Sequence, residues 1–247
     1  MCRLLAIKNK INDKDLKIVS NAFRKQSQFG KVPKGSNKGH KDGWGFVTYN
    51  LGKVALFKRS YNDAYSDNGY KIVENKILEE SRDIIIGHLR KSSIGKSSIN
   101  NSHPFVYKNF SFCQNGTIFN SERIRLKSKY KKLIKGDTDS ERLFYFILGE
   151  VEEKMTKSQI EKAIKKIRKG FDYTAMNILL SDGKKLFVLR DINLNNKEVK
   201  KLKMKDYYSL FIGINKKEKY TIIASEKIEI NGVNWQQMKN EEFIEIN

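Results

Sequence analysis

Short runs of hydrophobic residues, bounded by glycine and asparagine, predict β-strands in the first half and the last third of the chain. These runs cover residues 3–7, 45–49, 54–59, 83–90, 110–114, 175–180, 185–190, 208–214, 220–224 and 243–246. Ser181-Asp182-Gly183-Lys184, which separates two of the runs, is typical of a β-hairpin turn. Strands are therefore expected at both ends of the chain.

Hydrophobic residues spaced three and four apart predict helices between these strands. Asn12 and Asp13 can cap a helix whose apolar face carries Leu16, Val19 and Phe23. Further helices are expected at 70–78, 121–134 and 139–153, and another after the capping box formed by Thr156 and Gln159.

The order of these elements predicts an α+β fold. Strands come first, helices gather in the middle, and strands return, which favours two mainly antiparallel sheets with helices on the outside. No internal repeat, linker or change of composition divides the chain. A single domain over residues 1–247 is expected.

Composition narrows the class of protein. With 247 residues, of which 39% are hydrophobic and 31% charged, the chain is expected to fold as a soluble globular protein. No apolar run has the length of a membrane span, and the first residues lack the order of a signal peptide, which predicts a cytoplasmic protein. Two cysteines and three histidines without ligand-like spacing predict no disulfide framework, no metal site and no cofactor.

A net charge of +21 raises the alternative of a basic nucleic-acid-binding protein. The lysines, however, are spread along the chain, and the densest stretches, 127–135 and 162–169, alternate with apolar residues at helical spacing. Solvated helix faces explain this pattern. We expect neither a specific nucleic acid nor a membrane as a partner. Weak binding to polyanions at low salt is expected.

Cys2 is the first candidate for chemistry. If Met1 is removed, one residue carries both the thiol and the free α-amine, so a nucleophile has its own base. The alternative is a small hydrophobic residue buried at the start of a strand.

Five further segments each allow a structural and a functional interpretation. Residues 40–46 contain Trp44 between two glycines, as in a tight turn or in an aromatic wall of a site. Residues 87–90 end in an arginine that could form an ion pair or bind a carboxylate. Residues 101–105 could form a loop that positions the next strand. Residues 112–116 end in Asn-Gly, a turn or a pair of oxyanion donors. Residues 136–141 could cap a helix or supply a carboxylate for an ammonium group.

Taken together, these segments resemble a known family. Met-Cys-Arg-Leu-Leu-Ala, His-x-Asp-Gly-Trp-Gly, His-x-Arg, Asn-x-His-Pro, Asn-Gly and Asp-Ser-Glu follow the order and approximate spacing of class II glutamine amidotransferases. The chain resembles most their compact stand-alone branch, which includes amidases of ergothioneine synthesis and glutathione degradation. This likeness extends to 177–190, 223–226 and Trp235. It implies the four-layer αββα sandwich of N-terminal-nucleophile hydrolases.

The resemblance also implies roles for individual residues. Cys2 would be the nucleophile and its α-amine the general base. Asn115, through its side chain, and Gly116, through its N–H, would form the oxyanion hole. Arg90 would bind the α-carboxylate of the substrate, and Asp139 its α-ammonium with help from Gly116.

Other residues would line or support the pocket. Ser93 and His103 are expected to line or brace it, and His88, Trp44 and Gly45 to support it. Two positions depart from the family pattern: Gln114 stands where histidine is frequent, and Lys91 where a small or aromatic residue is common. Both are expected to affect pocket polarity and substrate choice.

The predicted function is a γ-glutamyl amide hydrolase that forms a Cys2 thioester. Its substrate would be glutamine or a γ-glutamyl conjugate, and it would release glutamate and ammonia or an amine. Burial is expected to raise the thiol pKa and lower the amine pKa. If ammonia is transferred, the acceptor is a separate synthetase. The alternative, a non-catalytic binding or regulatory module on the same fold, is favoured if Met1 is retained.

Overall fold

Two antiparallel β-sheets lie face to face in the computed structural model, which describes residues 2–80, 82–151 and 155–247. The seven-stranded sheet has the order β11-β9-β10-β1-β4-β2-β3 and the five-stranded sheet the order β12-β8-β7-β6-β5. The strands of the first sheet are β1 (Arg3–Lys8), β2 (Trp44–Asn50), β3 (Lys53–Ser60), β4 (Ile84–Leu89), β9 (Phe211–Asn215), β10 (Tyr220–Ala224) and β11 (Val233–Gln237). Those of the second are β5 (Phe105–Tyr107), β6 (Phe110–Asn115), β7 (Asn177–Ser181), β8 (Leu186–Arg190) and β12 (Glu242–Ile246).

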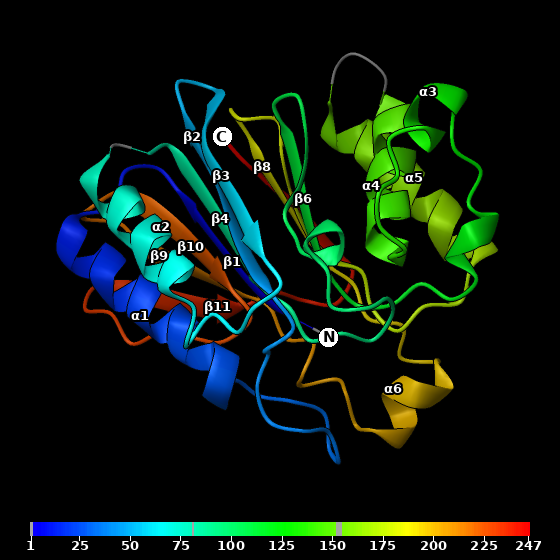
Figure 1. Cartoon of the computed structure of the whole chain (residues 1–247), viewed down its shortest axis with the longest axis horizontal. Helices are drawn as coiled ribbons and strands as arrows, with labels where there is room; N and C mark the ends of the chain where they lie inside the picture. The colour runs from blue at the N-terminus through cyan, green and yellow to red at the C-terminus, as the bar shows by residue number, and fades with distance from the viewer. Residues whose placement is uncertain (1, 81, 152–154) are drawn as a thin grey trace.

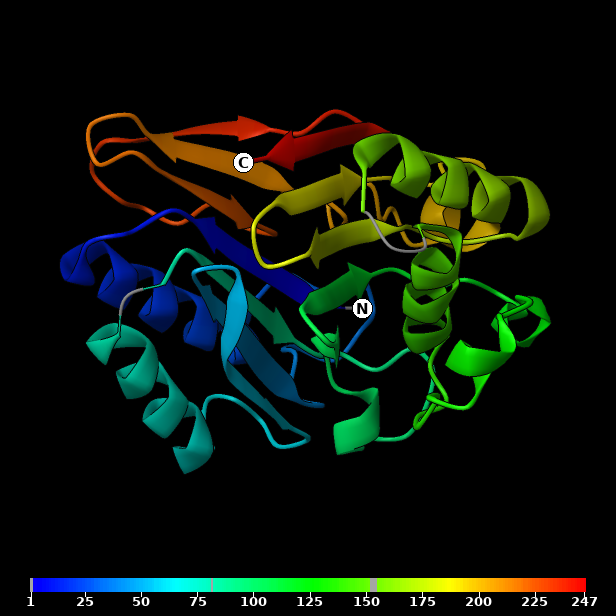
Figure 2. The same ribbon diagram turned by 90° about the horizontal axis from the view of Figure 1, so that it is seen from above.

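Helices cover the outer face of each sheet (Figures 1 and 2). The pair α1 (Asp13–Phe29) and α2 (Asn68–Glu79) packs on the seven-stranded sheet, and α4 (Asp139–Val151) and α5 (Lys157–Gly170) pack on the five-stranded sheet. Shorter helices are α3 (Ser128–Lys131), α6 (Lys197–Lys201) and two 3₁₀ turns, Ile99–Asn101 and Ser121–Arg123. The predicted α+β sandwich of four layers is confirmed.

The helix caps form as the sequence predicts. The Asn12 side chain accepts a hydrogen bond from the Asp15 N–H at 2.9 Å, and Thr156 Oγ1 accepts one from the Gln159 N–H at 3.3 Å. Each bond satisfies a backbone donor that the first turn of a helix leaves free.

Strand alternation determines which residues enter the interior between the sheets. In β4, Ile85 and Leu89 pack toward α1 and α2, whereas Ile84 and Ile86 pack against the second sheet. Because side chains of a strand alternate between its two faces, His88 also points between the sheets. The end of β4 therefore brings a polar residue into an otherwise apolar layer.

The helix predicted at 121–134 is wrong for most of its length. Only a 3₁₀ turn and the four residues of α3 are helical there. The Arg142 side chain donates to the carbonyls of Ser121, Glu122 and Ile124, and these bonds hold the segment in an extended connection.

Other boundaries differ by less. The strand predicted from Tyr208 begins at Phe211, because the Tyr208 carbonyl accepts from Asn177 and Arg190 instead of a strand neighbour. The short elements β5, α6 and β11 were not predicted, and the last residues of the helix predicted at 139–153 lie outside the described residues. None of the helices among the described residues is long and apolar enough to cross a membrane.

Candidate active site

Cys2 is held in place just before β1, between the two sheets. Its backbone N–H donates to Asn115 Oδ1 at 2.8 Å, and its carbonyl accepts from the Tyr207 hydroxyl at 3.4 Å. Its thiol lies 3.8 Å from the Lys91 carbonyl, beyond the end of β4, and only 7% of the residue is exposed. Nitrogen, carbonyl and sulfur are thus each fixed by a different segment. Met1 lies outside the described residues, so its removal stays a prediction.

Asn115 ends β6 and uses only part of its hydrogen-bonding capacity. The side chain is fully buried, its Oδ1 binds Cys2, and its Nδ2 has no partner among the described residues. Buried amide groups are normally paired, so a free donor beside a thiol indicates a place for a ligand oxygen.

Gly116 cannot be replaced by a larger residue without moving the backbone. Its φ is +148°, and a Cβ at this position would lie 1.8 Å from the Ala175 carbonyl oxygen. The chain therefore turns closely against the segment before β7 directly after Asn115. The predicted pair of Asn115 and Gly116 lies beside Cys2.

Arg90 follows β4 and carries a buried positive charge. Its guanidinium donates to Ser92 Oγ at 3.1 Å and to the Ile94 carbonyl at 3.0 Å, so the loop fixes its orientation. No carboxylate of the described residues forms an ion pair with it. A cation oriented by neutral acceptors retains its charge for an anionic ligand.

Asp139 is the first residue of α4 and lies across the cavity. Its Oδ2 accepts from the Ile118 N–H at 2.7 Å. Burial raises the pKa of this carboxyl group to about 6, although hydrogen bonds from backbone N–H groups oppose the rise. A buried carboxylate favours binding of a cationic ligand, because the ion pair compensates for the hydration that the carboxylate has lost.

One small cavity brings most of the predicted residues together. Those that line it are Cys2, Arg90, Ser93, His103, Gly116 and Asp139. Lys91 and Gln114, which were expected to affect pocket polarity, line it as well, and so do Thr138 and Ser140, to which the sequence assigned no role. Opposite charges on Arg90 and Asp139 make the cavity complementary to a zwitterion.

The residues predicted to brace or support the pocket divide into two groups. His103 Nδ1 accepts from the Gln114 N–H at 3.3 Å, and its ring centroid lies 4.1 Å from that of His88. A Cβ on Gly45 would lie 2.3 Å from the His103 carbonyl oxygen, so this glycine permits the segment to approach β2. Trp44 faces the opposite side of the sheet, where it packs on Tyr70 at 5.1 Å, and it does not line the cavity.

The thiol of Cys2 is more acidic than an ordinary cysteine. Burial alone would raise its pKa, but the positive charge of the amino terminus and the His88 imidazole lower it to about 5. The prediction that burial raises this pKa holds for burial itself, but the net shift is downward. Nearby positive charge outweighs desolvation because it stabilises the thiolate directly.

A cluster that sequence reasoning missed lies behind Cys2. The Arg3 guanidinium stacks over the Tyr207 ring at 4.3 Å and donates from Nε to His40 Nε2 at 3.1 Å. Since His40 Nε2 accepts, its Nδ1 carries the proton and donates to the Gln26 carbonyl at 3.1 Å. Burial lowers the pKa of His40 to about 2, so the ring is neutral. This cluster positions the Tyr207 hydroxyl that binds Cys2.

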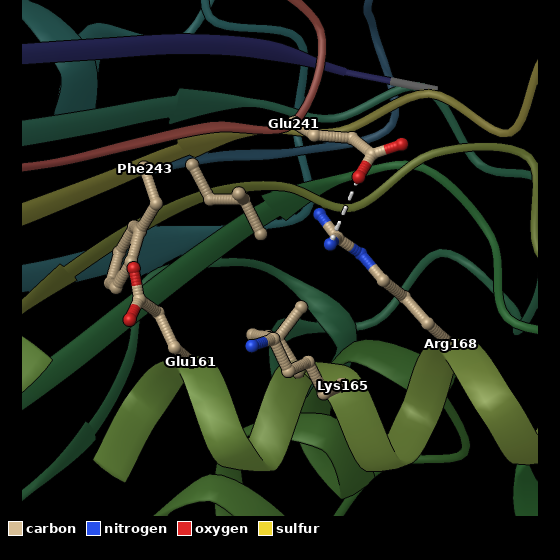
Figure 3. A pocket seen from close by; sticks show the side chains of 7 residues that line it. Glu161, Lys165, Arg168, Glu241 and Phe243 are labelled. Atoms are coloured by element: carbon tan, nitrogen blue, oxygen red, sulfur yellow. Dashed lines mark hydrogen bonds and ion pairs between the residues drawn. The ribbon is translucent and has the colours of Figure 1, made fainter. Parts of the chain in front are cut away.

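A second cavity, between α5 and the strands β8 and β12, has a different character (Figure 3). One of its charged residues, Arg168, binds Glu241 of the same lining at 3.3 Å and also the buried Asp191 at 2.8 Å. No cysteine, serine or threonine is among the described residues that line it. In the described part of the chain, no group of three or more histidine, cysteine, aspartate or glutamate side chains could hold a metal ion.

Sequence comparison identifies a protein family and several relatives. The family model of class II glutamine amidotransferases matches residues 1–246. An uncharacterized protein of Methanocaldococcus jannaschii is 30% identical over 84% of this chain and 56% of its own length. A putative glutamine amidotransferase of Haemophilus influenzae is 26% identical over 79% of this chain and 65% of its own length. The chain thus spans less than two thirds of these relatives.

Solved structures share the fold. A class II glutamine amidotransferase domain protein of Silicibacter pomeroyi has 18% identity and a TM-score of 0.63 over 99% of this chain and 94% of its own. The glutamine phosphoribosylpyrophosphate amidotransferase of Bacillus subtilis has 16% identity and a TM-score of 0.64, with 100% of this chain and 47% of that chain covered. Since the family model covers nearly every residue, the chain belongs to the class II glutamine amidotransferases.

Proposed function

We infer that the protein hydrolyses the γ-amide of glutamine or of a γ-glutamyl conjugate through a thioester on Cys2. One observation carries this inference: Asn115 binds the Cys2 nitrogen through Oδ1 and keeps its Nδ2 donor free. The same side chain can therefore orient the nucleophilic residue and donate to the oxygen that becomes negative during attack. Arg90 and Asp139 border the same cavity and match the two charges of a glutamyl group.

These positions support the following reaction. The Cys2 thiolate attacks the γ-carbonyl carbon, and the resulting oxyanion accepts hydrogen bonds from Asn115 Nδ2 and the Gly116 N–H. The Cys2 α-ammonium gives its proton to the leaving nitrogen, so ammonia or an amine departs as the carbon–nitrogen bond breaks. Water, deprotonated by the α-amine that remains, then attacks the thioester and releases glutamate and the thiolate.

The proposal also concerns the activity of the whole protein, the acceptor of ammonia and the location in the cell. The M. jannaschii and H. influenzae relatives are longer than the region they share with this chain, so the activity of the whole protein is also part of the proposal. If the product ammonia is used directly, a separate synthetase receives it. A cytoplasmic location, expected from the sequence, stays a prediction.

Glutamate release by the Met1-free protein tests the function. Intact mass first establishes whether Cys2 is N-terminal, and an enzymatic glutamate assay then compares glutamine with a panel of γ-glutamyl amides. We expect turnover of at least one of them, and none when a preparation retains Met1, because an acylated nitrogen is not a base. Binding of glutamine without any turnover by Met1-free protein would favour the non-catalytic module instead.

Glutamine binding is expected to weaken in acid. Only the ionised form of Asp139 pairs with an α-ammonium, and the pKa of this group is about 6. Below pH 6 the ionised fraction falls about tenfold per pH unit, and affinity should fall with it. Calorimetric titration of the Cys2→Ala variant between pH 7.5 and about 4.5 measures this dependence without turnover.

Asp139→Asn is the matched control for that titration. It is expected to bind glutamine weakly at every pH, with the acid dependence removed. If the affinity of Asp139→Asn falls with pH as steeply as that of the parent protein, a different group titrates, and the role of Asp139 is contradicted.

A further inference from the structure

Gln114 has an amide group without partners in the wall of the active-site cavity. The residue is 1% exposed, and neither its Oε1 nor its Nε2 forms a hydrogen bond with any described residue. Its backbone N–H is bound to His103, so the strand position is fixed while the side chain is not. Burying an unpaired amide is unfavourable, and a free donor and acceptor together indicate a polar ligand.

The direction of strand β6 turns the Gln114 side chain toward α4, the helix that begins at Asp139. Phe112, two residues earlier in β6, stacks on Phe144 of α4 with ring centroids 5.5 Å apart. Gln114 lies on the same face of the strand as Phe112 and therefore also faces α4. Farther along, the Ile118 N–H binds Asp139 at the first turn of that helix. Gln114 thus lies between the aromatic contact and Asp139, and it lines the cavity together with Asp139.

Counting donors and acceptors shows what the cavity lacks for a zwitterion. An α-ammonium group has three N–H donors, while one oxygen of Asp139 already accepts from Ile118. Arg90 has only donors and cannot accept. Gln114, which lines the same cavity, has an unpartnered neutral acceptor in Oε1 and unpartnered donors on Nε2.

We propose that Gln114 binds the α-amino-acid head of the substrate between Arg90 and Asp139 and makes the enzyme selective for amides that retain both charges. Gln114 Oε1 accepts from the α-ammonium and Nε2 donates to the α-carboxylate. This inference rests on the proposed function and adds a specificity-determining residue to it. Amides without an α-amine leave Oε1 unpaired and are rejected.

Two substrates and two variants test the proposal. The substrates are glutamine and glutaramate, which is glutamine without its α-amine. Gln114→Leu removes both polar atoms at similar volume, and Ser111→Ala, which removes another buried unpartnered group from β6, is the matched control. For Gln114→Leu we expect the KM for glutamine to rise about 10- to 100-fold with kcat nearly unchanged. We expect kcat/KM for glutaramate to fall much less, because glutaramate keeps only the carboxylate that Nε2 binds, and we expect Ser111→Ala to leave the kinetics of both substrates unchanged.

Three results would overturn the role of Gln114. They are an equal loss for both substrates, no loss for glutamine, or a fall in kcat with KM unchanged. Thermal unfolding by circular dichroism checks that Gln114→Leu is folded, and Gln114→Met, which is also apolar but unbranched, provides the same comparison if it is not. The proposed function fails separately, when the unmodified protein releases no glutamate from any substrate. In that case glutamine and glutaramate binding by calorimetry still compares the unmodified protein with Gln114→Leu.

Discussion

Replacing Cys2 with alanine is expected to lower kcat/KM for glutamate release by at least about 10⁴-fold, because no other group of the cavity can form the thioester. The remaining donors and charges still bind substrate, so glutamine affinity measured by calorimetry should stay within a few-fold of normal. A stopped enzymatic assay for glutamate gives the rate, and intact mass confirms the same N-terminal processing in both proteins. Substantial turnover by Cys2→Ala would exclude the proposed mechanism.

Alkylation provides an independent measure of the same thiol. With a pKa of about 5, Cys2 is almost entirely thiolate at pH 7, whereas an ordinary thiol of pKa about 8.5 is roughly 3% ionised. Iodoacetamide should therefore modify one cysteine at pH 6 with little change in rate up to pH 8. Cys113 is the internal control, since it is fully buried and burial raises its pKa well above the usual value. Peptide mapping that finds Cys113 modified first would contradict this assignment.

Local patterns explain which parts of the fold could be predicted from the sequence. The Asn12 and Thr156 caps act within three residues, and the apolar run of β4 needs no distant partner to indicate a buried strand. The helix predicted at 121–134 failed because Arg142, well outside that window, binds its carbonyls. Local propensity is reliable where no tertiary contact competes for the backbone groups.

The site was predictable to the extent that motifs name residue types. Asn115, Arg90 and Asp139 could be found because each carries a recognisable chemistry, and the fold gathers them around Cys2. The contact from Tyr207 to the Cys2 carbonyl spans 205 positions, and no pattern along the chain reports it.

Side-chain direction and electrostatics were the least accessible from sequence. Trp44 could equally have faced the site, and only the register of β2 turns it toward Tyr70. The net decrease of the thiol pKa was not predicted because burial was considered without the charge of the amino terminus and the position of His88. Both depend on distances that a motif does not contain.

Asn115→Ala is expected to lower kcat by about 10²- to 10³-fold, the usual effect of losing one oxyanion donor. The change removes Nδ2, which is free to donate, together with Oδ1, which holds the Cys2 nitrogen. Glutamine affinity should change little, since Arg90 and Asp139 remain. Steady-state kcat and calorimetric affinity separate these two effects.

Asn177→Ala provides the matched comparison, because Asn177 pairs directly with Asn115 in the β6–β7 ladder. Its Nδ2 donates to the Tyr208 carbonyl at 2.8 Å and its Oδ1 accepts from the Asp191 N–H at 3.1 Å. Both polar atoms are already used in the fold, so their loss should lower the unfolding midpoint by several degrees and affect kcat much less. Asn115 has an unpartnered Nδ2, so its replacement should lower kcat strongly and change the unfolding midpoint much less. If both variants lose stability and kcat in parallel, the free amide of Asn115 has a structural role rather than a catalytic one.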